Sequence, residues 1–278
     1  MKKLLKFIAL VSLFVFGASV VSAGDTGLEG TEVSAYLQGA YVDVTTAKTK
    51  LAGAGFEVIA TYASIENGNT IVFTNAALKA EGAKPKRAFA AVLRLFIDNQ
   101  AKTISITNPI YFGKAYMQDE YNHKVFNAQL EAINKAFAGL TPSADKLKFD
   151  DLAGYHFMIS RPYYEDTIEL AKGSNAELAT KAKGFQDGKG LIFELKLSDK
   201  STLLGYQLDD KTNLFVGKIG RANAAILPYC VSIEDGVVTM LHGEYYLALS
   251  YPLLDMGTFM TISSVPGAIQ KDLEKPFN

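Results

Sequence analysis

The chain has 278 residues, a formal net charge of −1 and a single cysteine. A nearly neutral chain offers no strongly basic surface, so its charge gives no reason to expect a nucleic-acid partner. One cysteine cannot form an internal disulfide. Stability must therefore come from a hydrophobic core, and the 49% hydrophobic composition supplies the side chains for one.

The N-terminal segment has the pattern of a secretory signal peptide. Three lysines form a basic start, an apolar stretch follows from Phe7, and Val21–Ala23 provides small residues for cleavage. The alternative, an uncleaved membrane anchor, would need about 20 apolar residues, and this stretch is shorter. We therefore predict cleavage after Ala23 (signal peptide 1–23), export to the periplasm, and no membrane span in the remaining chain.

After a flexible lead-in predicted over residues 24–32, the first half of the chain alternates strand and helix patterns. Asn67-Gly68 is typical of a tight hairpin turn between two strands. Apolar residues recur at helical spacing from Tyr121 to Phe137, which predicts an amphipathic helix. The other predicted helices are Thr45–Ala52, capped by Thr45 or Thr46, and Ala76–Ala80, and the predicted strands are Ala40–Val44, Phe56–Ile65 and Thr70–Thr74.

The clearest hairpin pattern lies at Phe89–Pro109. Apolar residues alternate along its first strand, a polar turn follows at Asp98–Lys102, and alternation resumes with Ile104 and Ile106. Phe89, Ala91, Leu93, Leu95 and Ile97 are predicted to share one face of the first strand.

A short linker is predicted at residues 141–148, between a first domain at 33–140 and a second at 149–278. The second half repeats the strand and helix patterns and contains a second hairpin at Ala225–Gly243. The predicted strands are Gly154–Ile159, Gly190–Leu197, Leu203–Leu208 and Leu214–Ile219, and the predicted helices run from Tyr163 to Lys183, with an interruption at Gly173–Asn175, and from Pro266 onward.

Matches that keep their order along the chain indicate an internal duplication. The alternative is that any two α+β halves share such patterns. We predict an α+β fold of two related units, each a mostly antiparallel sheet with helices packed on one face. The matched pairs are Tyr41 with Tyr155, Gly68–Phe73 with Gly188–Phe193, Leu95–Asp98 with Val231–Glu234, and Tyr111-Phe112 with Tyr245-Tyr246.

The second hairpin also carries a family resemblance. In Leu227–Val238, a Leu-Pro pair is followed by an apolar strand, an acidic turn and a second apolar strand. This segment resembles a bacterial family known only as domain of unknown function three-oh-two, and Phe89–Pro109 is similar apart from Ala91-Val92 in place of Leu-Pro. The resemblance implies a small α+β fold in tandem copies. It implies no catalytic residues.

The residues that carry chemistry predict binding rather than catalysis. No nucleophile motif and no complete phosphate-binding loop occurs, so we predict no cofactor. Cys230 lies in an apolar strand, which predicts a buried, inert thiol. Tyrosine combines apolar area with a hydrogen-bonding hydroxyl, and arginine binds anions. The predicted ligand-binding residues are Tyr111, Arg161, Tyr163, His242 and Tyr245.

Two of these residues have alternative interpretations. Arg161 is either an anion-binding group between tyrosines or the partner of Glu165 at a helix start. His242 could join Met240 and Met256 in a copper site, because thioether and imidazole ligands suit Cu(I). Methionines at such positions are more often core residues.

We therefore predict an exported, non-enzymatic binding protein. Its partner would be a small ligand or an envelope protein, held in a groove between the two domains, and a homo-oligomer remains open. The alternatives are a periplasmic hydrolase, whose site is assembled only in three dimensions, and a metal carrier using Met240, His242 and Met256.

Overall fold

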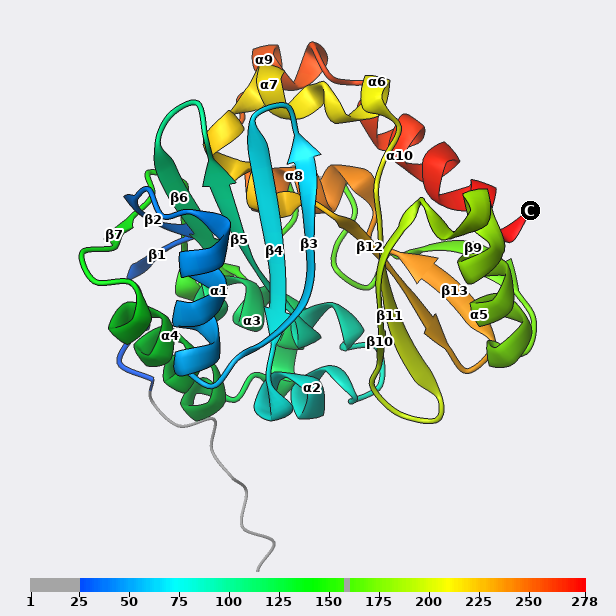
Figure 1. The fold of residues 1–278 in the computed structure, drawn as a ribbon, viewed down its shortest axis with the longest axis horizontal. Coiled ribbons are helices and arrows are strands. Elements are labelled where there is room, and N and C mark those ends of the chain that lie inside the picture. Colours follow the sequence, from blue (N-terminus) through cyan, green and yellow to red (C-terminus); the bar gives the residue numbers. More distant parts are fainter. Residues whose placement is uncertain (1–25, 158–160) are drawn as a thin grey trace, which may run out of the picture.

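The computed structural model describes residues 26–157 and 161–278, and the predicted signal peptide lies outside this part of the chain. Two antiparallel sheets lie side by side (Figure 1). One has six strands in the order β3-β4-β5-β6-β2-β7, and the other has five in the order β10-β11-β12-β13-β9. A small third sheet joins β1 (Glu32–Ser34) to β8 (Lys146–Lys148).

The first unit is built around the six-stranded sheet. Its helix α1 is capped by Asp43, whose Oδ1 accepts the Thr46 N–H at 2.9 Å, and not by Thr45 or Thr46 as we predicted. The elements are β2 (Tyr36–Ala40), α1 (Val44–Gly53), β3 (Glu57–Ile65), β4 (Gly68–Thr74), α2 (Ala76–Gly82), the 3-10 helix η1 (Ala88–Ala91), β5 (Leu93–Asp98), β6 (Thr103–Thr107), α3 (Pro109–Met117), η2 (Gln118–Glu120), α4 (His123–Ala136) and β7 (Thr141–Pro142).

The second unit is built around the five-stranded sheet. Its helix α5 starts at a capping box, in which Ser174 and Glu177 satisfy each other's backbone N–H groups. After η3 (Phe149–Asp151), the elements are β9 (Ile168–Lys172), α5 (Asn175–Gly184), η4 (Phe185–Gly188), β10 (Leu191–Lys196), β11 (Ser201–Tyr206), α6 (Asp210–Asn213), α7 (Phe215–Ile219), η5 (Arg221–Ile226), β12 (Tyr229–Glu234), β13 (Val237–Met240), α8 (Gly243–Ser250), α9 (Met256–Met260), α10 (Val265–Glu274) and η6 (Lys275–Phe277).

The two sheets have the same strand order, which confirms the prediction of an α+β fold with two related units. Without β7, the order β3-β4-β5-β6-β2 corresponds strand by strand to β10-β11-β12-β13-β9. The pairing supports the match of Leu95–Asp98 with Val231–Glu234. It does not support the match of Gly68–Phe73 with Gly188–Phe193, because β4 corresponds to β11 and not to β10. Nor does Tyr155 correspond to Tyr41, since Tyr41 follows β2 and Tyr155 precedes β9.

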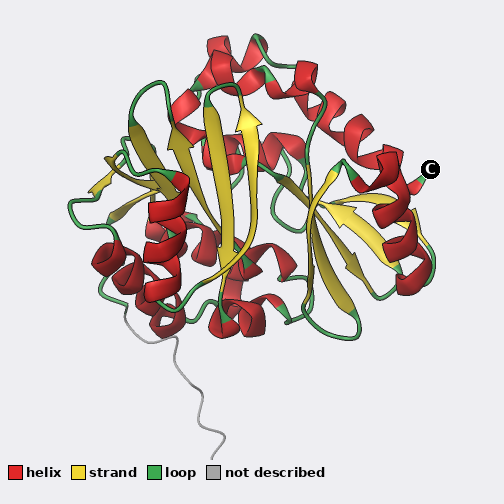
Figure 2. Ribbon diagram, viewed as in Figure 1, coloured by secondary structure: helices red, strands yellow, loops and turns green. Residues whose placement is uncertain are grey.

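Long helices cover each sheet on the side away from the other unit (Figure 2). In the first unit α1 packs on β3 and β4, and in the second α5 packs on β12 and α10 on β9. Figure 1 shows α1 and α4 at one end of the molecule and α5 and α10 at the other. Between the units, η5 packs on β5 and β6, η1 packs on β11 and β12, and the strands β3 and β10 contact each other directly.

Some predicted elements are wrong for identifiable reasons. In place of the strand predicted at Leu214–Ile219 the chain forms the helix α7 after Leu214: the consecutive residues Phe215 and Val216 are both buried, which does not fit a strand with one buried face. The predicted helix from Tyr163 includes the edge strand β9, in which Glu169 and Lys172 are exposed and the three apolar residues are half-buried. Residues 154–157 form no strand. Phe89 and Ala91 lie in η1 rather than in β5.

The predicted linker is part of the first unit rather than a free connection. Residues Thr141 and Pro142 pair with β2 as β7, and Lys146–Lys148 pairs with β1. The N-terminal segment predicted to be flexible is also tied down, since the Gly30 N–H donates to Asp150 Oδ2 at 2.7 Å. The first sheet therefore extends into the predicted connection between domains.

We expect Gly113→Ala to destabilise the first unit. A Cβ at Gly113 in α3 would overlap three ring atoms of Phe126 in α4. Overpacking costs about 1–3 kcal/mol and alanine regains up to about 1 kcal/mol of helix propensity, so we expect a net loss of about 1 kcal/mol in urea unfolding. The matched control is Gly267→Ala in α10, where a Cβ meets no atom within 4 Å. An unchanged or stabilised Gly113→Ala protein would contradict this packing.

Candidate functional site

The two units meet through reciprocal contacts between α3 and α8. The Tyr111 hydroxyl donates to the Leu249 carbonyl at 2.8 Å, and the Tyr245 hydroxyl donates to the Ala115 carbonyl at 3.5 Å. Both tyrosines are buried, and burial raises the pKa of both hydroxyls well above the ordinary value. Tyr111 and Tyr245 therefore join the units, and neither is placed to bind a ligand from solvent.

The structure brings Arg161 and His242 together around Glu244, at the start of α8. Arg161 Nη1 lies 3.1 and 3.0 Å from the two Glu244 carboxylate oxygens, so its partner is Glu244 and not Glu165. His242 Nδ1 accepts the Glu244 N–H at 3.2 Å and caps the helix. The exposed Tyr163 lies apart from this group, with its ring 4.5 Å from the His156 ring.

The predicted copper ligands lie in different environments. Met240 is completely buried in β13, whereas Met256 is 40% exposed in α9. His242 already uses Nδ1 to cap α8. Within the ranges that the structure describes, no group of three or more His, Cys, Asp or Glu side chains is arranged to hold a metal ion.

A pocket of about 340 Å³ lies between the two units. We call it the interface pocket. The first unit contributes the loop before η1 and the start of η1, and the second contributes β12, β13 and the segment before β9. Its most buried lining residues are Ala88, Phe89, Tyr164 and Ser232. The volume is within the range of small-molecule sites.

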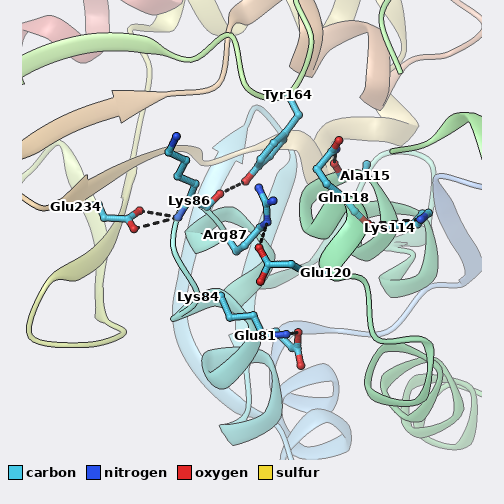
Figure 3. A network of polar contacts seen from close by, with 10 residues as sticks. All are labelled: Glu81, Lys84, Lys86, Arg87, Lys114, Ala115, Gln118, Glu120, Tyr164 and Glu234. Carbon is cyan, nitrogen blue, oxygen red and sulfur yellow. Dashed lines mark hydrogen bonds and ion pairs between the residues drawn. The ribbon is translucent and has the colours of Figure 1, made fainter. Parts of the chain in front are cut away.

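The backbone of Lys86 holds the two units together at this pocket (Figure 3). Its N–H donates to both Glu234 carboxylate oxygens, at 3.0 and 3.1 Å, and its carbonyl accepts the Tyr164 hydroxyl at 2.6 Å. Lys86 has a φ of +62°, which is uncommon for a residue other than glycine. The loop is thus held in a strained conformation by contacts from the second unit.

Arg87 forms the next part of the pocket wall. Its guanidinium lies 5.5 Å from the centre of the Tyr164 ring, and its Nε lies 3.3 Å from Glu120 Oε1 (Figure 3). Burial raises the pKa of the Tyr164 hydroxyl, and the Arg87 charge only partly opposes this. Tyr164 therefore stays protonated and donates its hydrogen bond to the Lys86 carbonyl.

In the first unit, an ion pair lies at the position that corresponds to the interface pocket. Asp98 pairs with Thr103 and Gly68 as Glu234 pairs with Val237 and Ser201, so Asp98 and Glu234 are equivalent. Asp98 lies 2.8 Å from Arg221 Nε and 3.2 Å from Arg221 Nη2.

The open place in the second unit has no such pair. The alignment that equates Asp98 with Glu234 places Pro85 opposite Arg221, and among the described residues no ion pair links the nearby Arg87 to Glu234. The interface pocket thus lies where the first unit has the closed Asp98–Arg221 contact.

Two differences between the units explain why only one place is open. The helix η5 packs on β5 and β6, whereas η1 packs on β11 and β12 and does not cover β13 in the same way. At the strand position equivalent to Phe96, the second unit has Ser232. A small side chain in place of a phenyl ring, together with the shifted η1, leaves the space unfilled.

None of the five predicted ligand-binding residues lines the interface pocket. The sequence nevertheless contained a signal for it. The match of Leu95–Asp98 with Val231–Glu234 already aligned Phe96 with Ser232, a change from a large residue to a small one within an otherwise apolar strand. Such a change between two copies marks a place where their packing differs.

A second buried contact joins the units beside Cys230. Arg94 Nη2 lies 2.9 Å from Cys230 Sγ and 3.4 Å from the Pro228 carbonyl oxygen. The prediction of a buried thiol is confirmed. Burial raises the pKa of Cys230 and the Arg94 charge opposes this only in part, so the thiol is neutral. Arg94 Nε has no hydrogen-bond partner among the described residues.

Across the described residues, no helix is both long enough and apolar enough to cross a bilayer. The comparisons with known proteins add no identity to this description. No family model matches the chain, and neither a curated protein nor a solved structure proves similar to it.

Proposed function

We propose that this protein is an exported binding protein whose small-molecule ligand lies in the interface pocket. The observation that carries the proposal is the open place at Ser232 and Glu234, where the equivalent residues of the first unit, Phe96 and Asp98, are packed and paired. Duplicated units that share a fold but differ at one place are expected to differ there in use.

The lining of the pocket also supports binding. Phe89, Ala88 and Val237 provide apolar surface, while Arg87 and Ser232 provide polar groups. Ser232 Oγ is buried without a hydrogen-bond partner among the described residues, whereas Arg87 Nε has the ion-pair contact with Glu120 at 3.3 Å. Buried polar atoms are usually satisfied, so an unpartnered one beside a pocket favours a ligand that supplies the missing partner.

Export to the periplasm remains part of the proposal. It rests on the basic and apolar pattern before Ala23. The sequence resemblance to domain of unknown function three-oh-two is compatible with such a role but assigns no ligand. An N-terminus beginning at Gly24 on protein from a periplasmic fraction would support export, and a full-length cytoplasmic protein would overturn it.

We expect Ser232→Phe to block the pocket. The phenyl ring would occupy the open space, as Phe96 occupies the equivalent position in the first unit. The probe is N-phenyl-1-naphthylamine, a neutral apolar fluorophore, and the chain has no tryptophan to interfere with its signal. We expect one probe molecule per chain to bind to the wild type, and at least tenfold weaker binding to Ser232→Phe.

Two further variants make this test decisive. Thr239→Phe fills the same pocket from β13 and replaces Ser232→Phe if that protein does not fold. Ser263→Phe adds the same ring at an exposed position outside the pocket and should bind as the wild type does. Unchanged probe binding by both pocket variants, or no binding by the wild type, would refute the proposal.

A further inference from the structure

We infer that the ligand of the interface pocket is a small zwitterion with an apolar side group, such as an apolar amino acid or a short peptide with free ends. The inference rests on the proposed function, because it names the chemistry recognised at the same site. The arrangement of the charged residues around the pocket carries the inference.

The pocket keeps an acidic and a basic side chain apart, whereas the acidic residue at the equivalent position of the first unit is paired with an arginine. In the first unit, Asp98 and Arg221 form a direct ion pair that closes the place. In the second unit Glu234, the equivalent of Asp98, and the nearby Arg87 both line the pocket, and Figure 3 shows them on opposite sides of Lys86. A ligand with both charges can replace the direct contact that is missing, with its carboxylate at Arg87 and its ammonium at Glu234.

Each of the two groups keeps the capacity to bind a ligand. Glu234 accepts a backbone N–H from Lys86, but among the described residues it has no cationic partner. Arg87 Nε lies 3.3 Å from Glu120 Oε1, and among the described residues the terminal nitrogens of Arg87 donate no hydrogen bond to a carboxylate. The terminal N–H groups are the ones that bind carboxylates in the two-pronged arrangement typical of arginine.

The remaining charges also favour a ligand that is neutral overall. The lining contains the cations Lys86 and Arg87 and the acidic residues Glu165, Glu234 and Asp235. Asp235 lies 3.6 Å from Lys200, which offsets its charge. A lining with both signs would repel part of any singly charged ligand, whereas it matches a zwitterion.

The buried part of the pocket accounts for the apolar side group. Ala88 and Phe89 are buried and line the pocket beside the charged residues. Burying an aromatic or branched side chain against such surface contributes favourably to binding. The inferred ligand therefore has a charged end at Arg87 and Glu234 and an apolar group near Phe89.

The test compares L-phenylalanine with two derivatives that each lack one charge, using calorimetric titration of the mature protein. Phenylalanine amide lacks the carboxylate, and N-acetyl-phenylalanine lacks the ammonium. We expect L-phenylalanine to bind at least tenfold more tightly than either derivative. Phenylalanyl-phenylalanine, titrated in parallel, distinguishes the two sources: tighter binding than L-phenylalanine would identify a peptide as the ligand, and weaker binding would identify a free amino acid.

Charge-removing variants assign each end of the ligand. Arg87→Gln should weaken L-phenylalanine binding at least tenfold and leave binding of the amide unchanged. Glu234→Gln should weaken L-phenylalanine binding and leave binding of N-acetyl-phenylalanine unchanged. Both variants keep a side chain of similar size, and their binding of N-phenyl-1-naphthylamine shows whether the pocket is intact.

The two levels of the proposal fail in different ways. If the fluorophore binds and Ser232→Phe blocks it, but L-phenylalanine binds no more tightly than its derivatives, the zwitterion is refuted and a binding pocket remains. If the fluorophore does not bind the wild type, or pocket-filling variants do not weaken its binding, the proposed function itself is refuted.

Discussion

Asp98→Ala should lower the free energy of unfolding by about 3 kcal/mol, at the lower end of what removal of one partner from a buried ion pair costs. The Asp98 side chain is 3% exposed and its partner Arg221 is 27% exposed. The same carboxylate accepts the N–H groups of Gln100 and Ala101, at 2.9 and 3.0 Å, in the β5–β6 turn. Removing it leaves Arg221 without a counter-charge and also loosens the turn.

The matched control is Glu234→Ala at the equivalent position of the second unit. Glu234 has no cationic partner among the described residues, so we expect a loss below about 1 kcal/mol. Urea unfolding of both variants measures the difference. Equal losses would show that the ion pair does not distinguish the two units.

The contribution of Asp98 should depend on pH in a defined direction. Burial raises the pKa of its carboxyl, but hydrogen bonds from Arg221, Ala101 and Gln100 outweigh burial and hold the pKa below the ordinary value. A lowered folded pKa means that the stabilisation is complete above the unfolded pKa of about 3.9 and is lost as the pH falls through the folded pKa. As the pH is lowered below about 4, the free energy of unfolding of Asp98→Asn should therefore decrease less than that of the wild type.

Arg94→Met should stabilise the protein by about 2 kcal/mol, although it removes a buried side chain with two contacts. Arg94 is 5% exposed, and no carboxylate of the described residues forms an ion pair with it. Its contacts are a neutral thiol and a carbonyl oxygen at 3.4 Å. Replacing buried charged groups by apolar residues of similar volume is often neutral or stabilising by about 1–4 kcal/mol.

The control is Arg94→Lys, which keeps the buried charge but cannot reproduce the planar guanidinium. We expect Arg94→Lys to be less stable than the wild type. The lysine ammonium is more strongly hydrated than the guanidinium, so its burial costs more free energy, and it loses one of the two contacts. Urea unfolding compares the three proteins. A marked loss of stability in Arg94→Met would mean that the guanidinium contributes more than its two observed contacts indicate.

The fold could be predicted largely from periodic patterns. The apolar residues of Leu93–Ile97 and Tyr229–Ile233 specify strands, both of which are buried on both faces, and the stripe from Val125 to Ile133 specifies a helix, because these patterns reflect local backbone geometry. The same reasoning failed at Leu214–Ile219 and Ile168–Lys172. In such short segments, tertiary contacts such as the pairing of β9 with β13 outweigh the local pattern.

The candidate site was predicted only indirectly. Tyr111 and Tyr245 do lie where the units meet, but their hydroxyls are used in contacts that hold the units together. The pocket instead involves Arg87, Tyr164 and Ser232, which come from three separate parts of the chain. Sequence spacing does not show which side chains from distant segments approach one another.

The sequence by itself determined the two-unit α+β architecture, the buried thiol and the alignment of Phe96 with Ser232. These properties follow from side-chain periodicity and from the comparison of one half with the other. Only the tertiary structure decided that Asp98 is paired while Glu234 faces an open pocket. That difference depends on where η1 and η5 pack on the partner unit's sheet, which is a long-range contact with no local pattern in the chain.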